Sequence, residues 1–220
     1  MPPQRALLVF AKAPQLGRVK TRLAADLGEE TALKIYRALA EHIWTQLVEI
    51  RDTLYFKLWL CFDPPEAEKN MLTWLPGADH YLPQTRGDLG ARISRAFETA
   101  FIRGFEQVAI VGMDMPRLDG SHLQDAFHRA HKGRVIVGPT YDGGFYLMAL
   151  SAPWAALEFI FEDVPWSSHK ALFTIHQKAS AFGLDWMELP IEEDIDTADD
   201  WQRFQKTPLG QRFAKLLLAL

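Results

Sequence analysis

Apolar positions follow two patterns along the chain: short continuous runs, and longer segments in which apolar residues recur at helical spacing. The short runs end in Gly, Pro or charged residues, which is typical of buried strands. They predict strands or extended segments over residues 5–10, 53–62, 80–82, 107–112, 134–138, 144–150 and 185–189. Helical spacing predicts helices over residues 29–50, 66–75, 89–103, 121–131, 167–182 and 197–204.

This alternation of strands and helices predicts an α/β protein. A sheet built in this way is expected to be largely parallel, with helices on both faces. No repeat and no Gly/Ser-rich linker divides the chain. We therefore expect a single domain over residues 1–220, in which residues 207–220 form a C-terminal docking helix; an oligomer contact is the less favoured interpretation of that apolar tail.

The composition narrows the class of protein. The chain has 220 residues, of which 48% are hydrophobic and 24% charged, so it can bury a sizeable core. A net charge of −4 gives no basic excess for nucleic-acid binding. The single cysteine, Cys61, lies in an apolar run and is expected to be a buried thiol. No apolar run approaches the ~20 residues of a membrane helix, and the N-terminus lacks a signal-peptide layout, so we expect a cytoplasmic protein without membrane insertion.

Residues 109–116 form an apolar strand that stops at a carboxylate, Asp114. Gly112 allows close backbone approach, and Pro116 prevents simple continuation of the strand. In open α/β sheets, ligands bind at the carboxyl ends of such strands. The segment alone leaves two interpretations open, because Asp114 could hold a divalent metal or could cap the following turn.

The loop over residues 12–22 follows the first strand and is rich in cations. Lys12, Lys20 and Arg22 could meet phosphate oxygens, and Gly17 permits close backbone approach. Val19 stands where a P-loop requires glycine, so this is not that motif. A solvated basic loop is the alternative interpretation.

Two further loops follow predicted strands. Asp88 could cap the helix that begins beside it, or its loop could face the base or sugar of a nucleotide. Asp142 lies in an Asp-Gly-Gly sequence that is typical of a turn, and it is also a second carboxylate at the end of a strand.

The last polar segment covers residues 192–200. Thr197 and Asp200 fit a capping box, while Asp194 and Asp196 precede it. If these two carboxylates meet Asp114, they make an oxygen site suited to Mg²⁺ or Mn²⁺; otherwise they form a solvated acidic face. The loops after the first, third, fourth and fifth strands should lie on one rim of a parallel sheet.

An ordered set of motifs resembles a known family. The chain is similar to the bacterial family of predicted glycosyltransferases in the nucleotide-diphospho-sugar transferase superfamily, from about residue 5 to 205. Relatives of that family include molybdenum-cofactor nucleotidyltransferases and phospholactate guanylyltransferases. The motifs are Phe10-Ala11-Lys12-Ala13-Pro14, Gly17-Arg18-Val19-Lys20-Thr21-Arg22-Leu23, Gln84 with Gly87-Asp88-Leu89-Gly90, Gly112-Met113-Asp114-Met115-Pro116, Gly138-Pro139 with Asp142-Gly143-Gly144-Phe145-Tyr146, and Asp194-Ile195-Asp196-Thr197.

The resemblance implies a three-layer α/β/α sandwich of the GT-A type, with a mostly parallel sheet and a nucleotide site in its N-terminal half. It implies that Asp114 is the first metal ligand and Asp196 the second, and that Lys20 and Arg22 contact nucleotide phosphates. Met115 and Ala198 depart from the residues that members often have there, but neither is a proposed ligand.

We therefore expect a metal-dependent glycosyltransferase that uses Mg²⁺ or Mn²⁺ to move a sugar from a nucleotide-sugar to a small-molecule acceptor. Asp114, Lys20 and Asp142 are the expected catalytic residues. The expected substrate-binding residues are Lys12, Gly17, Lys20, Thr21, Arg22, Gln84, Asp88, Gly143 and Gly144.

Two alternatives remain open at this point. One is a nucleotidyltransferase that joins an NTP to a phosphorylated metabolite, and the other is a non-catalytic nucleotide-binding module. The aromatic residues Trp154, Phe159, Phe161 and Trp166 could line an acceptor pocket, although core or interface packing is the more common role for such a cluster.

Overall fold

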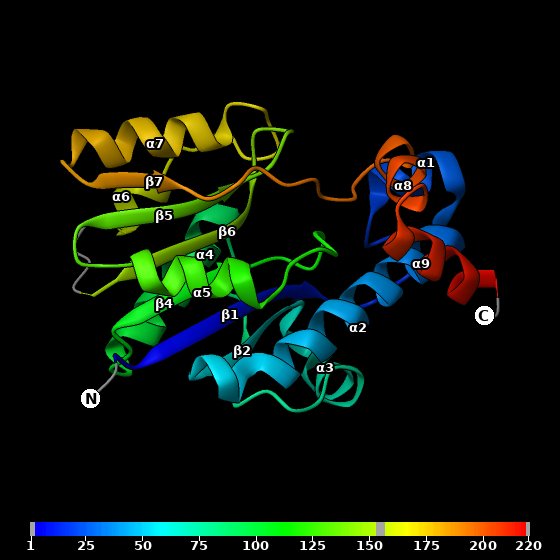
Figure 1. Cartoon of the computed structure of the whole chain (residues 1–220), viewed down its shortest axis with the longest axis horizontal. Coiled ribbons are helices and arrows are strands. Elements are labelled where there is room, and N and C mark those ends of the chain that lie inside the picture. The colour runs from blue at the N-terminus through cyan, green and yellow to red at the C-terminus, as the bar shows by residue number, and fades with distance from the viewer. Residues whose placement is uncertain (1–2, 153–156, 219–220) are drawn as a thin grey trace.

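The fold is built on one seven-stranded sheet with the strand order β3-β2-β1-β4-β6-β5-β7 (Figure 1). The computed structural model describes residues 3–152 and 157–218. Its strands are β1 (Arg5–Lys12), β2 (Phe56–Asp63), β3 (His80–Pro83), β4 (Gln107–Val111), β5 (Arg134–Pro139), β6 (Phe145–Ser151) and β7 (Asp185–Glu188).

The sheet is mostly parallel, as predicted. Strand β6 alone among the described strands runs antiparallel to its neighbours, β4 and β5. The reason is local, because only the turn over residues 140–144 joins β5 to β6, and a parallel crossover requires a dozen or more residues. Strands β1, β4 and β5 therefore share one direction, and their carboxyl ends lie at one edge of the sheet.

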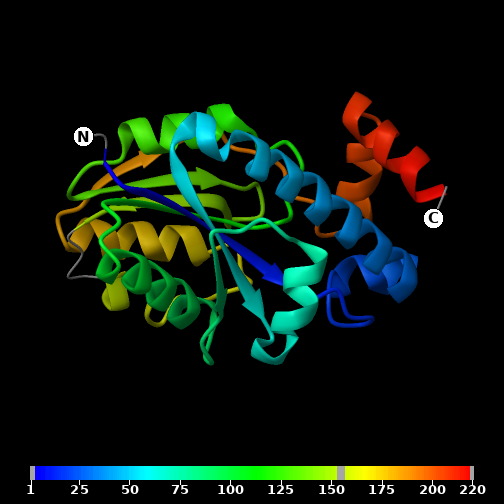
Figure 2. The ribbon, with the colours of Figure 1, turned by 90° about the horizontal axis from the view of Figure 1, so that it is seen from below.

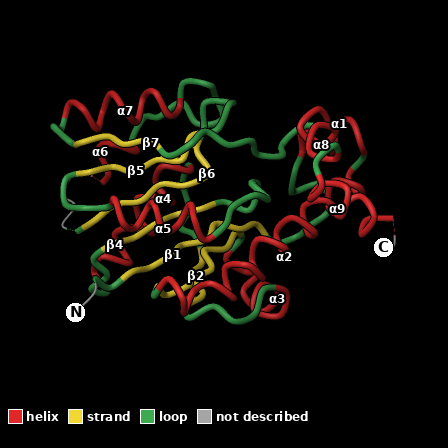
Figure 3. Tube along the Cα trace, in the orientation of Figure 1, coloured by secondary structure: helices red, strands yellow, loops and turns green. Residues whose placement is uncertain are grey.

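Helices connect most of the strands (Figure 3). The described helices are α1 (Thr21–Leu27), α2 (Glu29–Leu54), α3 (Glu68–Trp74), α4 (Leu89–Ile102), α5 (Gly120–Arg129), α6 (Leu157–Phe161), α7 (Ala171–Ala181), α8 (Ala198–Gln205) and α9 (Pro208–Leu218), with a 3-10 turn over Pro65–Ala67.

Alternating side chains of the central strand β1 enter two separate cores. Leu7 and Val9 pack with α2, α3 and α5 on one face of the sheet. Ala6 and Leu8 pack with α4, α6 and α7 on the opposite face. Because successive side chains of a strand point to opposite faces, this is the packing that a buried central strand requires. The predicted three-layer α/β/α sandwich is confirmed.

A smaller apolar cluster lies beyond the sheet, where α1, α8 and α9 gather around α2 (Figures 1 and 2). Leu23 of α1, Leu39 of α2 and Phe213 of α9 are buried in it. The tail expected as a docking helix thus packs on α2 and α8 over Pro208–Leu218, and residues 219–220 lie outside the described part. Ile195 belongs to the same cluster, so the segment that carries Asp194 and Asp196 is anchored there.

Some boundaries differ from those expected. Helix α1 was not predicted as a separate element, because Leu23 is its one fully buried residue and gives no periodic pattern. Helix α2 continues to Leu54, through residues expected to start a strand. The positive charge of Arg51 in its last turn stabilises the C-terminal end of the helix through the helix dipole. Helix α7 begins at Ala171 rather than at residue 167.

The described helices include none with the length and apolar character needed to cross a membrane.

Candidate functional site

A cavity of about 920 Å³ lies at the carboxyl edge of the sheet. It collects loops that follow β1, β3, β4 and β5, together with the segment before α8, so the predicted gathering of these loops on one rim is observed. The polar and charged residues that line it include Lys12, Arg18, Lys20, Thr21, Arg22, Gln84, Asp114, Thr140, Asp142, Asp194 and Asp196.

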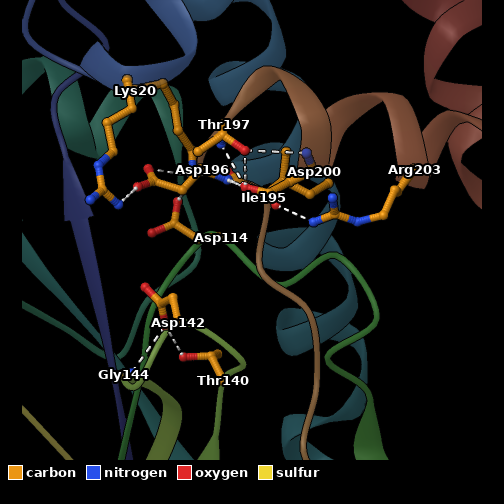
Figure 4. Close-up of polar contacts among 11 residues, drawn as sticks. Lys20, Asp114, Thr140, Asp142, Gly144, Ile195, Asp196, Thr197, Asp200 and Arg203 are labelled. Carbon is orange, nitrogen blue, oxygen red and sulfur yellow. Dashed lines mark hydrogen bonds and ion pairs between the residues drawn. The ribbon is translucent and has the colours of Figure 1, made fainter. Parts of the chain in front are cut away.

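The centre of the cavity holds an ammonium group between two carboxylates. Lys20 Nζ lies 2.6 Å from Asp114 Oδ1 and 3.9 Å from Asp196 Oδ1. It also donates a hydrogen bond to the carbonyl oxygen of Ile195. Figure 4 shows these side chains pointing toward one another from three separate segments of the chain.

A backbone contact joins two of these three segments. Asp114 follows the end of β4, and its carbonyl oxygen accepts a hydrogen bond of 2.9 Å from the Ile195 amide. Thr197 caps α8 in a reciprocal capping box with Asp200, as the sequence predicted, which fixes the residues directly after Asp196. The position of Asp196 is therefore fixed on one side by the contact of Ile195 with Asp114 and on the other by the start of α8.

Arg22 supplies a more exposed cation at the same carboxylate. Its guanidinium donates to Asp196 Oδ2 at 3.0 Å, and its side chain is 61% exposed. The hydrogen bond with Asp196 raises the pKa of Arg22 above its ordinary value. Asp196 is thus shared between a buried ammonium and a solvent-facing guanidinium.

Asp142 lies across the cavity and shapes its own turn. One oxygen, Oδ1, accepts from Thr140 Oγ1 at 2.6 Å and from the Gly144 amide at 3.0 Å. Oδ2 has no hydrogen-bond or ion-pair partner among the described residues. Asp194 lines the same cavity, and burial, followed by repulsion from Asp142, raises its pKa to about 6.

Gln84 is buried at the side of the cavity formed by β2 and β3. Its amide donates to the Cys61 carbonyl at 2.8 Å, and its Oε1 accepts from Arg92 at 3.4 Å. Arg92 also lies 3.3 Å from Asp63 Oδ2 and donates to the Gly87 carbonyl at 3.1 Å. This network fixes the loop that leads into α4.

Three of the expected substrate-binding residues lie outside the cavity lining. Asp88 caps α4 by accepting from the Ala91 amide at 2.9 Å. Gly17 has a positive φ of 71° and lies against Glu29, and Gly143 packs against the backbone of His169. The cavity brings together the other expected residues, including Gly144.

The expected aromatic cluster is divided. Trp166 lines the cavity, whereas Phe161 is buried in the core beneath α4. Phe159 is 40% exposed and packs on Phe182, away from the cavity. Trp154 lies outside the described residues.

Sequence reasoning missed several residues of the site. Tyr36 lines the cavity from α2, where its spacing marks only a core position; its hydroxyl accepts from the Lys12 amide at 2.9 Å and donates to the Lys12 carbonyl at 2.7 Å. Arg18 and Thr140 also line it. Both stand within loops already identified as polar, but no spacing separates them from their neighbours.

The donor set at the centre is compatible with a hard divalent cation. No group of three or more His, Cys, Asp or Glu side chains occurs in the described residues in an arrangement that could hold a metal alone. Two carboxylates, Asp114 and Asp196, are nevertheless the number that Mg²⁺ commonly takes from a protein, because water and substrate phosphates provide its remaining ligands.

Several solved structures share this fold. The protein from Desulfovibrio desulfuricans G20, described as a candidate nucleotide-diphospho-sugar transferase, is 24% identical, with a TM-score of 0.81 and 98% of this chain and 96% of that chain covered. A nucleotidyl transferase from Methanothermobacter is 15% identical, with a TM-score of 0.56 over 97% and 99% of the chains. Rv0371c of Mycobacterium tuberculosis H37Rv in complex with manganese is 16% identical, with a TM-score of 0.51 over 92% and 98%.

At these identities the similarity establishes a shared fold and no more. No curated protein matches the chain. Residues 46–168, more than half of the chain, match a bacterial family; this region includes Gln84, Asp114 and Asp142 but not Lys20 or Asp196. The chain therefore belongs to the family described as "Uncharacterized protein conserved in bacteria (DUF2064)".

Proposed function

We propose that this protein is a metal-dependent transferase that binds the phosphates of a nucleotide donor in the cavity at the carboxyl edge of its sheet. One observation carries the proposal: the basic loop after β1 and the carboxylates Asp114 and Asp196 converge in a single cavity of about 920 Å³. Cations for phosphates and oxygen ligands for a metal are the groups that phosphoryl-bearing donors require.

Asp114 and Asp196 would hold Mg²⁺ or Mn²⁺. When bound, the ion would offset negative charge on the donor's phosphates and on the departing group. The fit of two carboxylates to such an ion supports this assignment, and so does the manganese complex of Rv0371c, a protein of the same fold.

Protein cations would share the task of stabilising the departing phosphates. Lys12, Lys20 and Arg22 line the cavity beside the two carboxylates, with Thr21 between the last two. Lys20 is buried, so its interaction with a phosphate would be screened less than that of an exposed lysine. Gly17 would act indirectly, by shaping the loop that presents these side chains.

The remaining predicted residues would position the donor and acceptor. Gln84 would contact the nucleoside from the β3 side, where Asp88 fixes the loop by capping α4. Oδ2 of Asp142, which has no partner in the described part of the chain, would orient hydroxyl groups of the sugar or of the acceptor. Gly143 and Gly144 would keep that turn compact.

Glycosyl transfer is the first candidate reaction. A sugar linked to a nucleoside diphosphate presents hydroxyl groups beyond the phosphates, and Asp142 faces the cavity across from Lys20 and Asp114 with one oxygen unpaired among the described residues. A carboxylate in that position can accept hydrogen bonds from sugar hydroxyls. The fold shared with the Desulfovibrio protein is consistent with such a donor.

Nucleotidyl transfer is the second candidate, and the basic loop favours it. Arg18, Lys20 and Arg22 lie within five consecutive residues directly before and at the start of α1, where they could contact the phosphates of an NTP. The shared fold of the Methanothermobacter nucleotidyl transferase is consistent with this reaction. Here a phosphorylated acceptor would attack the α-phosphate of the NTP and release pyrophosphate.

Product analysis separates these candidates. The protein is incubated with Mn²⁺ and a panel of nucleotide-sugars or NTPs, with and without pooled small-molecule acceptors. Acceptor-dependent release of a nucleoside diphosphate, with the sugar recovered on the acceptor, would identify glycosyl transfer. Acceptor-dependent release of pyrophosphate, with the nucleotidyl group recovered on the acceptor, would identify nucleotidyl transfer. Mn²⁺-dependent nucleotide binding with neither product across the panel would instead support a binding module and contradict the proposed activity.

A further inference from the structure

We propose that the ammonium group of Lys20 occupies the place of the metal between Asp114 and Asp196, so that a divalent cation binds only as Lys20 leaves those carboxylates. The inference rests on the proposed metal site. It assigns to Lys20 a role as a built-in competitor of the metal, in addition to any contact that it makes with phosphates.

The contacts of Lys20 are those of a bound cation. Its ammonium meets three oxygen acceptors from two segments of the chain: Asp114 Oδ1 at 2.6 Å, the Ile195 carbonyl, and Asp196 Oδ1 at 3.9 Å. The side chain is only 3% exposed. Lys20 is the one buried charged residue among the described residues, so these acceptors offset a substantial desolvation cost.

The charges at the site explain why the Lys20 ammonium and a divalent ion would compete. Asp114 and Asp196 carry two negative charges, and Lys20 and Arg22 pair with them. If a divalent ion bound to these carboxylates while Lys20 stayed in place, the ion and the ammonium would contact the same oxygen atoms. Like charges at such distances repel, and the Lys20 side chain is 3% exposed although that of Asp114 is 49% exposed. The ion therefore gains its ligands only when the ammonium withdraws.

Helix α1 does not depend on the Lys20 ammonium. Lys20 is the N-cap residue of α1, but its side chain makes no capping hydrogen bond. Its backbone carbonyl accepts the first helical hydrogen bond, at 2.8 Å from the Ala24 amide. The side chain can therefore swing away from the carboxylates while the start of α1 stays in place.

The backbone of Lys20 is held in an uncommon conformation. With φ of 48° and ψ of 46°, it lies in the left-handed region, which is energetically costly for a residue that has a Cβ. From this backbone position the Lys20 side chain reaches Asp114 (Figure 4). Contacts with the two carboxylates and the Ile195 carbonyl offset that cost.

Binding of Mn²⁺ alone, without nucleotide, tests the competition. Electron paramagnetic resonance of free Mn²⁺ gives the Kd for the wild-type protein, for Lys20→Met and for Lys12→Met. Lys12 is a matched control, because it is an exposed cation that lines the same cavity and has no ion pair with either carboxylate among the described residues. We expect Lys20→Met to bind Mn²⁺ at least about tenfold more tightly than the wild type, and Lys12→Met to change the Kd less than threefold.

Two outcomes would overturn the inference: no tightening in Lys20→Met, or equal tightening in Lys12→Met. Lys20→Gln provides a neutral side chain that can still donate to the Ile195 carbonyl, so it repeats the test if the methionine variant does not fold. Asp114→Asn distinguishes a failure of the proposed metal site from a failure of the proposed competition. Mn²⁺ binding that survives this substitution contradicts the metal site itself, whereas binding that is lost, together with an unchanged Kd in Lys20→Met and Lys20→Gln, contradicts only the competition.

Discussion

At the scale of single residues, the hydroxyl group of Tyr36 provides hydrogen bonds for the backbone at the end of β1, beside the cavity. The pairing between β1 and β4 ends at Val9 and Val111, so the last residues of β1 lose that neighbour. Tyr36, which is buried, takes the place of the missing strand by bonding to both the amide and the carbonyl of Lys12. Burial raises the pKa of its hydroxyl, which therefore stays protonated and can donate.

Removal of this hydroxyl should be costly. Tyr36→Phe leaves a part-buried backbone amide and carbonyl without this partner, so we expect the free energy of unfolding in urea to fall by about 1 kcal/mol. Tyr55→Phe is the matched control, since Tyr55 is 75% exposed, and should change it by less than about 0.5 kcal/mol. Equal stability of Tyr36→Phe and the wild type would contradict the role of Tyr36.

Local polar features of the site were predictable from sequence, and long-range ones were not. The cap at Asp88 and the capping box of Thr197 with Asp200 join residues within a few positions of each other, so their spacing reveals them. The pair of Lys20 with Asp114 joins segments that four α-helices and three strands separate along the chain. No local spacing encodes that contact, and the sequence predicted only a shared rim.

At the scale of secondary structure, close packing of α4 against α6 depends on one small residue. A Cβ on Gly90 would overlap the carbonyl oxygen of Phe161 and would crowd the Trp166 indole. Because backbone cannot yield as a flexible side chain can, Gly90→Ala should destabilise the protein by about 3 kcal/mol, measured by chemical unfolding.

Gly120, at the start of α5, provides the comparison. There an added Cβ would make only an ordinary contact, 3.7 Å from Ile50 Cδ1. Gly120→Ala should therefore be neutral, or stabilising by up to about 1 kcal/mol through its higher helix propensity. If the two alanine variants unfold at the same denaturant concentration, the proposed close contact is wrong.

Asp79 joins the end of α2 to the start of β2. Its carboxylate accepts from the Leu58 amide and from Lys57 Nζ, both at 2.9 Å, and lies 3.7 Å from Arg51. Burial alone would raise the pKa of Asp79, but these donors and cations outweigh it and hold the pKa below its ordinary value.

Because the pKa of Asp79 is lowered by folding, its contribution to stability should be lost in acid. An acid whose pKa is lower in the folded state stabilises the fold above the pKa of the unfolded chain, and this contribution is lost as the pH falls through the folded value. Asp79→Asn should thus cost about 1 kcal/mol in unfolding free energy at pH 7 and progressively less below pH 4. Asp52→Asn, at a side chain that is 93% exposed, should show no such pH-dependent loss; a loss from Asp79→Asn that is constant from pH 7 to pH 3 would refute this reasoning.

Most elements were predictable because their apolar spacing extends over several turns or over whole strands. Helix α1 and the direction of β6 were not. The first buries a single fully enclosed side chain, Leu23, and the second is set by the length of the turn after β5, since the alternation of a buried strand is the same in either direction.

At the scale of the whole molecule, the sheet brings distant loops together, and the smaller apolar cluster of α1, α2, α8 and α9 completes the site. Strands β1 and β4 deliver Lys20 and Asp114 to one edge of the sheet, and β5 delivers Asp142. The segment that carries Asp196 lies between β7 and α8, late in the chain. Ile195 anchors it in the cluster of α1, α2, α8 and α9. The positions of the proposed metal ligands therefore depend on the sheet and on this smaller apolar cluster.

The most direct test of the proposed function is the thermal stability of the wild-type protein and of Asp114→Asn and Asp196→Asn with nucleotide-sugars and NTPs, with and without Mn²⁺. A ligand at 100 times its Kd stabilises a folded protein by about 2.7 kcal/mol. We predict that at least one nucleotide produces a shift of this size in the wild type only when Mn²⁺ is present, and in neither variant. A nucleotide shift that is independent of Mn²⁺, or that persists in both variants, would contradict the metal-dependent nucleotide site.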